Sequence, residues 1–162
     1  MVTKEELASK KFINNAEFKR ASYQVTAAEM RRFEANKTLN DKVYKKITDY
    51  TKKNNIKPKY EGLEEICQLS STSLKKSCAG TQKITRYFLY KLTVGLHMSV
   101  EEANELFKLC GGVLAEDNIE DFICYKALLD GDDINRFIDE FNSVIKEYDK
   151  LQTADKLKKL YE

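Results

Sequence analysis

Residues 69–85 read LSSTSLKKSCAGTQKIT, a stretch of hydroxyl and lysine side chains around a few apolar residues. Ser70 can serve as the N-cap of a short helix, because its hydroxyl can accept a hydrogen bond from the backbone N–H three residues later. Leu69 and Leu74 then occupy the two positions of a hydrophobic staple. Gly80 follows where a left-handed residue is favoured. The stretch therefore predicts a helix with both ends marked, and not a polar loop.

The predicted helix has two different faces. Leu74 and Cys78 point to the same, inward side. The opposite side is free of large apolar side chains and consists of Thr72, Lys75, Lys76 and Ala79. Polar and basic residues continue at the start of the next helix with Gln82, Lys83 and Arg86. Because ammonium groups, hydroxyls and exposed helix N–H groups all suit phosphate oxygens, this pattern favours contact with DNA.

The rest of the chain reads as a series of helices. It has one proline and six glycines, so few positions interrupt a helix. Capping boxes at residues 3–6, 26–29 and 99–102 mark three helix starts. Together with the apolar spacing, these signals predict helices over residues 3–13, 26–36, 40–54, 62–68, 84–96, 99–110, 117–130 and 134–151, followed by a polar tail from Gln152.

Two of these helices carry a marked apolar stripe. In the helix over residues 117–130, the predicted inward side consists of Ile119, Phe122, Ile123 and Ala127. The last helix has apolar residues alternately three and four apart, namely Ile134, Phe137, Ile138, Phe141, Val144, Ile145, Tyr148 and Leu151. This continuous seam packs either on the rest of the domain or on a second copy of the chain.

Three stretches between residues 40 and 142 resemble, in order and spacing, parts of the five-helix Cro/repressor-type helix-turn-helix domain. LEEICQLSSTSLKKSCAG (63–80) is similar to the paired helices, with an apolar-Ser turn at Leu69-Ser70 and Leu74 inside the second helix. RYFLYKLTVGLHMSVEEANELFKLCGG (86–112) is similar to the fourth and fifth helices. DNIEDFICYKALLDGDDINRFIDEF (117–141) resembles a helical extension that follows this domain in some proteins of Gram-positive bacteria and their mobile elements.

The resemblance implies an all-α fold with three parts. These are an N-terminal helical arm over residues 1–39, a five-helix Cro/repressor-like helix-turn-helix core over residues 40–112 and a C-terminal helical extension over residues 113–162. The helix over residues 71–78 is then the recognition helix, inserted in the major groove of double-stranded DNA. The residues to which the resemblance assigns DNA contact are Ser71, Thr72, Lys75, Lys76, Gln82, Lys83 and Arg86.

The sequence departs from the family pattern at two points. Glu64 stands where the family has a small residue that lets the paired helices approach closely. The recognition helix also contains no Arg, Asn or Gln, the side chains that make bidentate contacts to guanine or adenine. We therefore expect DNA binding of low sequence specificity and steep salt dependence.

The net charge of +2 conceals an asymmetry along the chain. Residues 1–86 carry 19 Lys and Arg against 10 Asp and Glu, whereas residues 87–162 carry 9 against 16. The basic half indicates a polyanionic partner, although solvated helices also carry such runs. No stretch approaches the roughly 20 apolar residues of a membrane span, and the first residues lack the apolar core of a signal peptide. We expect a cytoplasmic protein with no membrane partner.

No pattern typical of a catalytic or metal site is present. The cysteines at 67, 78, 110 and 124 are far apart and form no Cys-x-x-Cys pair, so we expect no metal and no cofactor. His97, the only histidine, is interpreted as structural. The acidic pairs at 101–102 and 132–133 lie at predicted helix starts, where the helix dipole favours carboxylates. We therefore expect no enzymatic activity.

Two functions remain open. The first is a DNA-binding transcriptional regulator of bacterial or phage origin, with residues 132–151 as the candidate homodimer surface. The second is a protein-interaction factor on the same scaffold, such as a phage inhibitor of a host defence nuclease of the anti-CRISPR kind. The N-terminal arm mixes basic residues with aromatics, which suits docking on the core, a nucleic-acid arm or a protein surface; these aromatics are Phe12, Phe18, Tyr23 and Phe33.

Overall fold

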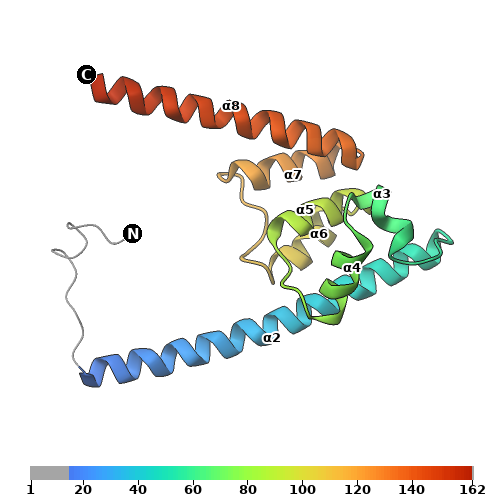
Figure 1. Ribbon diagram of the computed structural model, residues 1–162, viewed down its shortest axis with the longest axis horizontal. Coiled ribbons are helices and arrows are strands. Elements are labelled where there is room, and N and C mark those ends of the chain that lie inside the picture. Colours follow the sequence, from blue (N-terminus) through green and yellow to red (C-terminus); the bar gives the residue numbers. More distant parts are fainter. Residues whose placement is uncertain (1–14, 162) are drawn as a thin grey trace. The chain divides into compact units, whose positions relative to one another are not determined.

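The computed structural model describes residues 15–161, with side chains from residue 29 onward except at 32 and 33. Over this range the protein is all-helical and contains no β-strand. The elements are α2 (Asn15–Lys53), the 3-10 helix η1 (Glu61–Leu63), α3 (Glu64–Cys67), α4 (Ser71–Ala79), α5 (Arg86–Gly95), α6 (Val100–Phe107), α7 (Ile119–Asp130) and α8 (Ile134–Tyr161), as drawn in Figure 1. The helix predicted over residues 3–13, and the side chains of Phe12, Phe18, Tyr23 and Phe33, lie outside the described residues.

Backbone contacts divide the chain into two units, residues 1–35 and residues 36–162. The first contains the N-terminal part of α2. The second contains the rest of α2 and all the following helices, including those of the predicted C-terminal extension. Along the described residues, no helix has the length and apolarity needed to cross a bilayer.

Helix α2 is one continuous helix, so the prediction of two helices over residues 26–36 and 40–54 is wrong. The Asn and Thr residues between 36 and 40 are weak helix formers, but each costs at most about 0.7 kcal/mol in a helix interior. Leu39, Val43 and Ile47 lie one turn apart and are at most 1% exposed. Burying such side chains contributes roughly 1.5–3 kcal/mol each, which outweighs the weak helix propensity.

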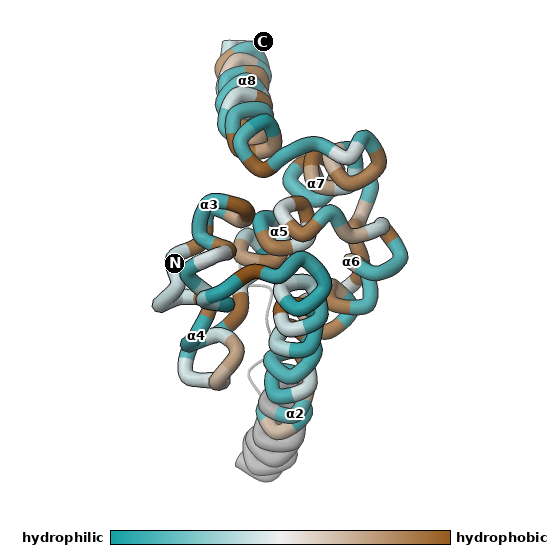
Figure 2. Tube along the Cα trace, turned by 90° about the vertical axis from the view of Figure 1, so that its right-hand side faces the viewer, coloured by the Kyte–Doolittle hydropathy of each residue, from teal (hydrophilic) through white to brown (hydrophobic). Residues whose placement is uncertain are grey.

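Helix α5 lies at the centre of the second unit. Seven of its ten residues are buried, so it is covered on nearly every side. It packs against α3, α6, α7 and α8, and Figure 2 shows it between α3 on one side and α6 and α7 on the other. The core around it is contiguous and includes Leu63, Leu74, Leu89, Leu92, Leu106, Phe107 and Phe137.

Most predicted helix ends are confirmed, because the capping side chains make the expected hydrogen bonds. Ser99 Oγ accepts from the backbone N–H of Glu102 at 3.1 Å and starts α6. Asn118 Oδ1 caps α7 in the same way, one residue after the predicted start. Gly131, with φ +66°, ends α7 as predicted. The capping box predicted at residues 26–29 does not start a helix, since it lies inside α2.

The buried side of α7 differs from the prediction at one residue. Ile123 and Ala127 are buried, but Phe122 is 41% exposed and is not part of the inward side. Asp121 takes the inward place and is only 4% exposed. The apolar spacing alone placed Phe122 inside, whereas a carboxylate can take a buried position only when it is paired.

Asp121 is paired by groups from two other segments. Its carboxylate receives hydrogen bonds from Arg86, at 2.8 Å to Nη2 and 3.3 Å to Nε, and from the backbone N–H of Ala115 at 3.0 Å. The hydroxyl of Tyr90 also donates to it. Burial, together with this hydrogen bond, raises the pKa of the Tyr90 hydroxyl above its ordinary value. We call these four residues the Asp121 cluster.

Helix α8 begins on the core and continues beyond it (Figure 1). Ile134, Phe137 and Phe141 are buried, so the first turns of the seam pack on the same chain. Further along, Tyr148 is 41% and Leu151 is 67% exposed. The polar tail predicted from residue 152 is helical to Tyr161. Of the candidate homodimer surface over residues 132–151, only the second half is therefore open to a partner.

We predict that Asp121→Asn lowers the free energy of unfolding by about 2–4 kcal/mol, because a neutral amide leaves the guanidinium of Arg86 uncompensated. The change is measured by urea unfolding followed by circular dichroism. Asp130→Asn, at the exposed end of the same helix, is the matched control and changes stability by less than about 0.5 kcal/mol. Equal stability of the two variants would show that the Asp121 cluster does not hold α7 in place.

Candidate nucleic-acid interface

The candidate interface is built on α3, a tight turn and α4. Gln68 ends α3 with φ +51°, which reverses the chain direction within one residue. Ser70 then caps α4, and its hydroxyl accepts from the backbone N–H of Ser73 at 3.1 Å. Gly80 ends α4 with φ +79°. Both predicted ends of this helix are thus confirmed.

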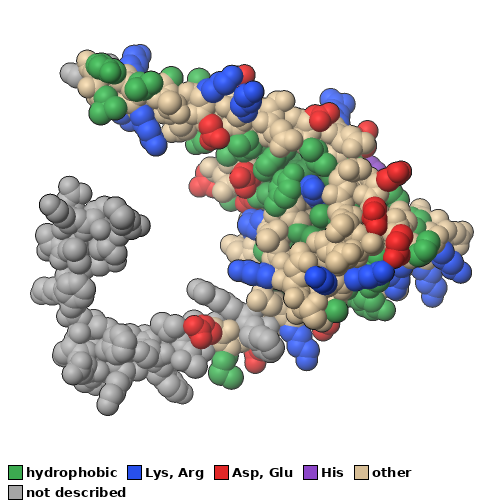
Figure 3. All heavy atoms as spheres, viewed as in Figure 1, with side chains coloured by type: hydrophobic (Ala, Val, Ile, Leu, Met, Phe, Trp, Pro, Cys, Tyr) green, Lys and Arg blue, Asp and Glu red, His purple; other side chains and the backbone are tan. Residues whose placement is uncertain are grey.

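Helix α4 has one buried and one open side, as its sequence predicts. Leu74 and Ser77 are fully buried, and Cys78 is partly buried. The other side is exposed to solvent and consists of Thr72, Lys75, Lys76 and Ala79; we call these four residues the outward face of α4. Figure 3 shows Lys and Arg side chains along the edge formed by α4 and the adjoining part of α2, with Asp and Glu side chains nearer α3.

Gly95 allows a close approach of α5 to α3, which is a different contact from that of the paired helices α3 and α4. A Cβ atom on Gly95 would lie 2.6 Å from the carbonyl oxygen of Ile66 and 2.8 Å from Cys67 Sγ. The end of α5 therefore touches the backbone of α3 directly. Glu64, at the position where the family has a small residue, is exposed, and its side chain accepts a hydrogen bond from the first residue of α4. Because α3 sits against α5, the outward face of α4 is held in a fixed orientation relative to the core.

Two carboxylates lie at the N-terminal end of α4. Glu64 Oε1 accepts a hydrogen bond from the backbone N–H of Ser71 at 3.2 Å. Glu61 Oε1 lies 2.7 Å from the ammonium of Lys75, and this hydrogen bond holds the pKa of Glu61 below its ordinary value. The Lys75–Glu61 pair is exposed, so salt or another anion competes with it readily. The N-terminus of α4 is thus less open to phosphate than its C-terminal half.

The three predicted residues after α4 have different environments. Gln82 is exposed and donates to Ser73 Oγ at 3.1 Å, so it lies beside α4. Lys83 is exposed. Arg86 instead points into the protein, where it binds Asp121 and donates to the carbonyl oxygens of Gly112, at 2.8 Å, and Cys110. Because these bonds use its guanidinium inside the fold, we leave Arg86 out of the interface.

Part of α2 also borders the outward face of α4, which the sequence pattern did not indicate. The side-chain nitrogen of Asn40 lies 3.1 Å from the position of a Cβ on Gly80, so the two helices touch there. Lys37 lies one turn before Asn40 on the same side of α2 and is exposed. Lys59 stands over the ring of Tyr44 at 4.8 Å and donates to Thr48. In the sequence, only the three- and four-residue spacing of residues 37, 40 and 44 indicates that they share one side of α2.

The described residues contain no group of three or more His, Cys, Asp or Glu side chains that could hold a metal ion. All four cysteines are free thiols. Burial raises the pKa of Cys67 and of Cys124 to about 12. These two thiols therefore stay protonated at neutral pH and are poor nucleophiles and metal ligands.

No protein-family model, curated protein or solved structure matches the chain. The resemblance to the Cro/repressor-type domain therefore stays a prediction. The arguments for a function come from the geometry, exposure and charge of the surface described above.

We predict that Gly95→Ala lowers the free energy of unfolding by about 1–3 kcal/mol, because the added methyl group meets the backbone of α3. Thermal unfolding monitored by circular dichroism measures the effect. Thr72→Ala, on the outward face of α4, is the control and should stay within about 0.5 kcal/mol of the parent chain. If Gly95→Ala is as stable as this control, α3 does not rest on α5 as described.

Proposed function

We propose that the protein binds double-stranded DNA through the outward face of α4, as a helix-turn-helix regulator of bacterial or phage type. The observation that carries the proposal is the outward face itself. It is a capped helix that offers two lysines, a hydroxyl and a methyl group to solvent, with no large apolar side chain in the way. Such a surface can enter the major groove closely and contact phosphate oxygens on either side.

The charge distribution sets how the DNA lies on this surface. Glu61 and Glu64 repel phosphate at the N-terminal end of α4, so the backbone contacts fall toward its C-terminal end. There Lys76 and Lys83 are exposed, and Lys37 of α2 borders the same end. When DNA binds, the ammonium of Lys75 leaves the carboxylate of Glu61 and pairs with a phosphate group of the DNA. The DNA thus lies across the end of α4 that adjoins α2.

Base recognition is weak in this proposal. The outward face of α4 offers lysines and a threonine hydroxyl, but none of the forked side chains that read guanine or adenine by two bonds. Gln82 could supply one such contact if it released Ser73. Affinity then comes mainly from phosphate contacts, each of which adds roughly 0.9 to the slope of log K against log salt concentration.

The test is fluorescence anisotropy of a labelled mixed-sequence duplex, titrated with protein at several salt concentrations. We predict that Lys76→Glu combined with Lys83→Glu weakens binding at least tenfold and lowers the salt slope by about 2. The matched control is Lys126→Glu combined with Lys146→Glu, which makes the same change in net charge on α7 and α8.

We expect the control pair to weaken binding no more than about threefold, through the net charge alone. The proposal fails if the parent chain does not bind the duplex at low salt. It also fails if both double variants lose affinity equally, because binding would then follow net charge and not the outward face of α4.

A second candidate function is protein interaction, and the end of α8 favours it. Tyr148, Leu151, Leu157 and Leu160 are 41–78% exposed, in a stretch of α8 where every residue from 146 to 161 is exposed. We predict that a partner captured from nuclease-treated host lysate is retained by the parent chain and lost with Tyr148→Ser plus Leu151→Ser. Sedimentation of the purified chain tells a second copy from a foreign partner. Equal capture by both proteins would exclude α8 as the surface.

A further inference from the structure

A row of lysines runs along one solvent-facing side of α2. Lys37, Lys45 and Lys52 are exposed, and their spacing brings them onto the same side of the helix. Lys59 joins the row from the loop after α2, where its ammonium donates to Thr48 Oγ1 at 3.1 Å. We call these four lysines the α2 ridge. At a rise of 1.5 Å per residue, the part of the ridge on the helix spans about 22 Å.

The surroundings of the α2 ridge are strongly basic. Residues 37–59 contain eight lysines against two aspartates, and one of these, Asp41, lies within the row. Among the described residues, Lys37, Lys45 and Lys52 have no ion-pair partner. Their ammonium groups stand about 10 Å apart along the helix and cannot converge on one small anion. The row therefore favours a partner with repeated negative charges.

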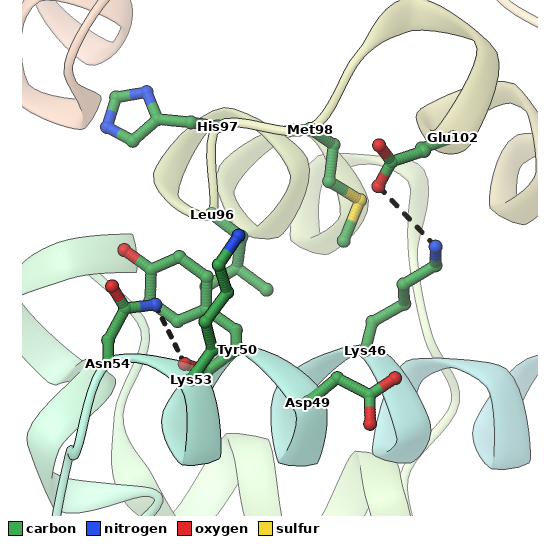
Figure 4. A pocket seen from close by; sticks show the side chains of 9 residues that line it. All are labelled: Lys46, Asp49, Tyr50, Lys53, Asn54, Leu96, His97, Met98 and Glu102. Atoms are coloured by element: carbon green, nitrogen blue, oxygen red, sulfur yellow. Dashed lines mark hydrogen bonds and ion pairs between the residues drawn. The ribbon is translucent and has the colours of Figure 1, made fainter.

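The other edge of α2 is different, because acidic side chains balance its lysines. There Lys46 Nζ lies 3.5 Å from Glu102 Oε2. Figure 4 shows both residues, with Asp49 and Lys53, at the cleft between α2 and the turn that joins α5 to α6. Two lysines and two carboxylates line this cleft, and none of its lining residues belongs to α4. This edge thus offers a polyanion less net charge than the α2 ridge does.

The α2 ridge is continuous with the outward face of α4. At its first turns, the side-chain nitrogen of Asn40 lies 3.1 Å from the position of a Cβ on Gly80, at the end of α4. Further along, the residue after Lys59 is Tyr60, whose hydroxyl forms a hydrogen bond with the thiol of Cys78 in α4. These two contacts hold the ridge beside the C-terminal end of α4, which is the end proposed above to receive phosphates.

We propose that the α2 ridge is a second contact surface for the same DNA duplex, which leaves the outward face of α4 and runs along α2. The duplex carries one negative charge per roughly 1.7 Å of its axis, so phosphates face every lysine of the ridge in any register. Lysines that meet only the DNA backbone position the duplex without reading its sequence. The inference rests on the proposed binding of DNA by α4 and adds the direction in which the duplex continues.

The test compares two double variants on the labelled mixed-sequence duplex, by anisotropy at several salt concentrations. Lys45→Gln combined with Lys52→Gln should weaken binding at least fivefold and lower the salt slope by about 2. Lys46→Gln combined with Lys53→Gln is the matched control and should weaken binding no more than about twofold. Each pair removes the same charge from α2 at the same spacing and includes one lysine of its last turn.

Lysine and glutamine have similar helix propensities, so both variants should melt at the same temperature as the parent chain. If the parent chain does not bind the duplex, the proposed function and the α2 ridge fail together. If it binds, and Lys76→Glu with Lys83→Glu weakens binding while the two glutamine pairs bind equally well, the α2 ridge alone is wrong. Tighter binding of the corresponding single strand than of the duplex would overturn the duplex as the partner of the ridge.

Discussion

The carboxylate of Asp121 joins α7 to α5, whose Arg86 lies 35 residues earlier in the sequence, and to the loop just before α7. It is nearly inaccessible to solvent, and it receives hydrogen bonds from Arg86 and Tyr90 of α5 and from the backbone of Ala115 before α7. The same arginine also holds the carbonyl oxygen of Gly112 and lies 5.0 Å from the ring centre of Phe107. A buried charge is tolerated only when it is paired and hydrogen-bonded in this way. The position of α7, and of α8 packed upon it, depends on this cluster.

Helix α5 transmits this constraint to the candidate interface. One end of α5 binds α7 through Arg86, and the other end touches the backbone of α3 at Gly95. Because α5 is short and buried, the two contacts fix α3 relative to α7 through a single rigid element. The turn at Gln68 and the Ser70 cap then fix α4 relative to α3. The outward face of α4 is thus presented by the core as a whole and not by a flexible loop.

The proposed functional surfaces lie on different parts of the second unit, and each uses a different kind of chemistry. The outward face of α4 is basic and hydrophilic, with Glu61 and Glu64 limiting anion contact to one end. The end of α8 is an amphipathic helix with exposed leucines. Small charge changes on the outward face of α4 therefore leave the end of α8 intact, which makes their roles separable.

Local interactions made α4 and most helix ends predictable from the sequence. A serine cap, a terminal glycine and the spacing of Leu74 act within four or five residues, so the neighbours of each are known from the chain itself. The sequence by itself thus determined where α4 begins and ends and which of its sides faces solvent. Tertiary structure alone decided that α2 is unbroken, that Asp121 and not Phe122 points inward, and that Arg86 serves the core instead of a phosphate. Each of these outcomes depends on a partner brought close only by folding, since Asp121 and Arg86 are 35 residues apart.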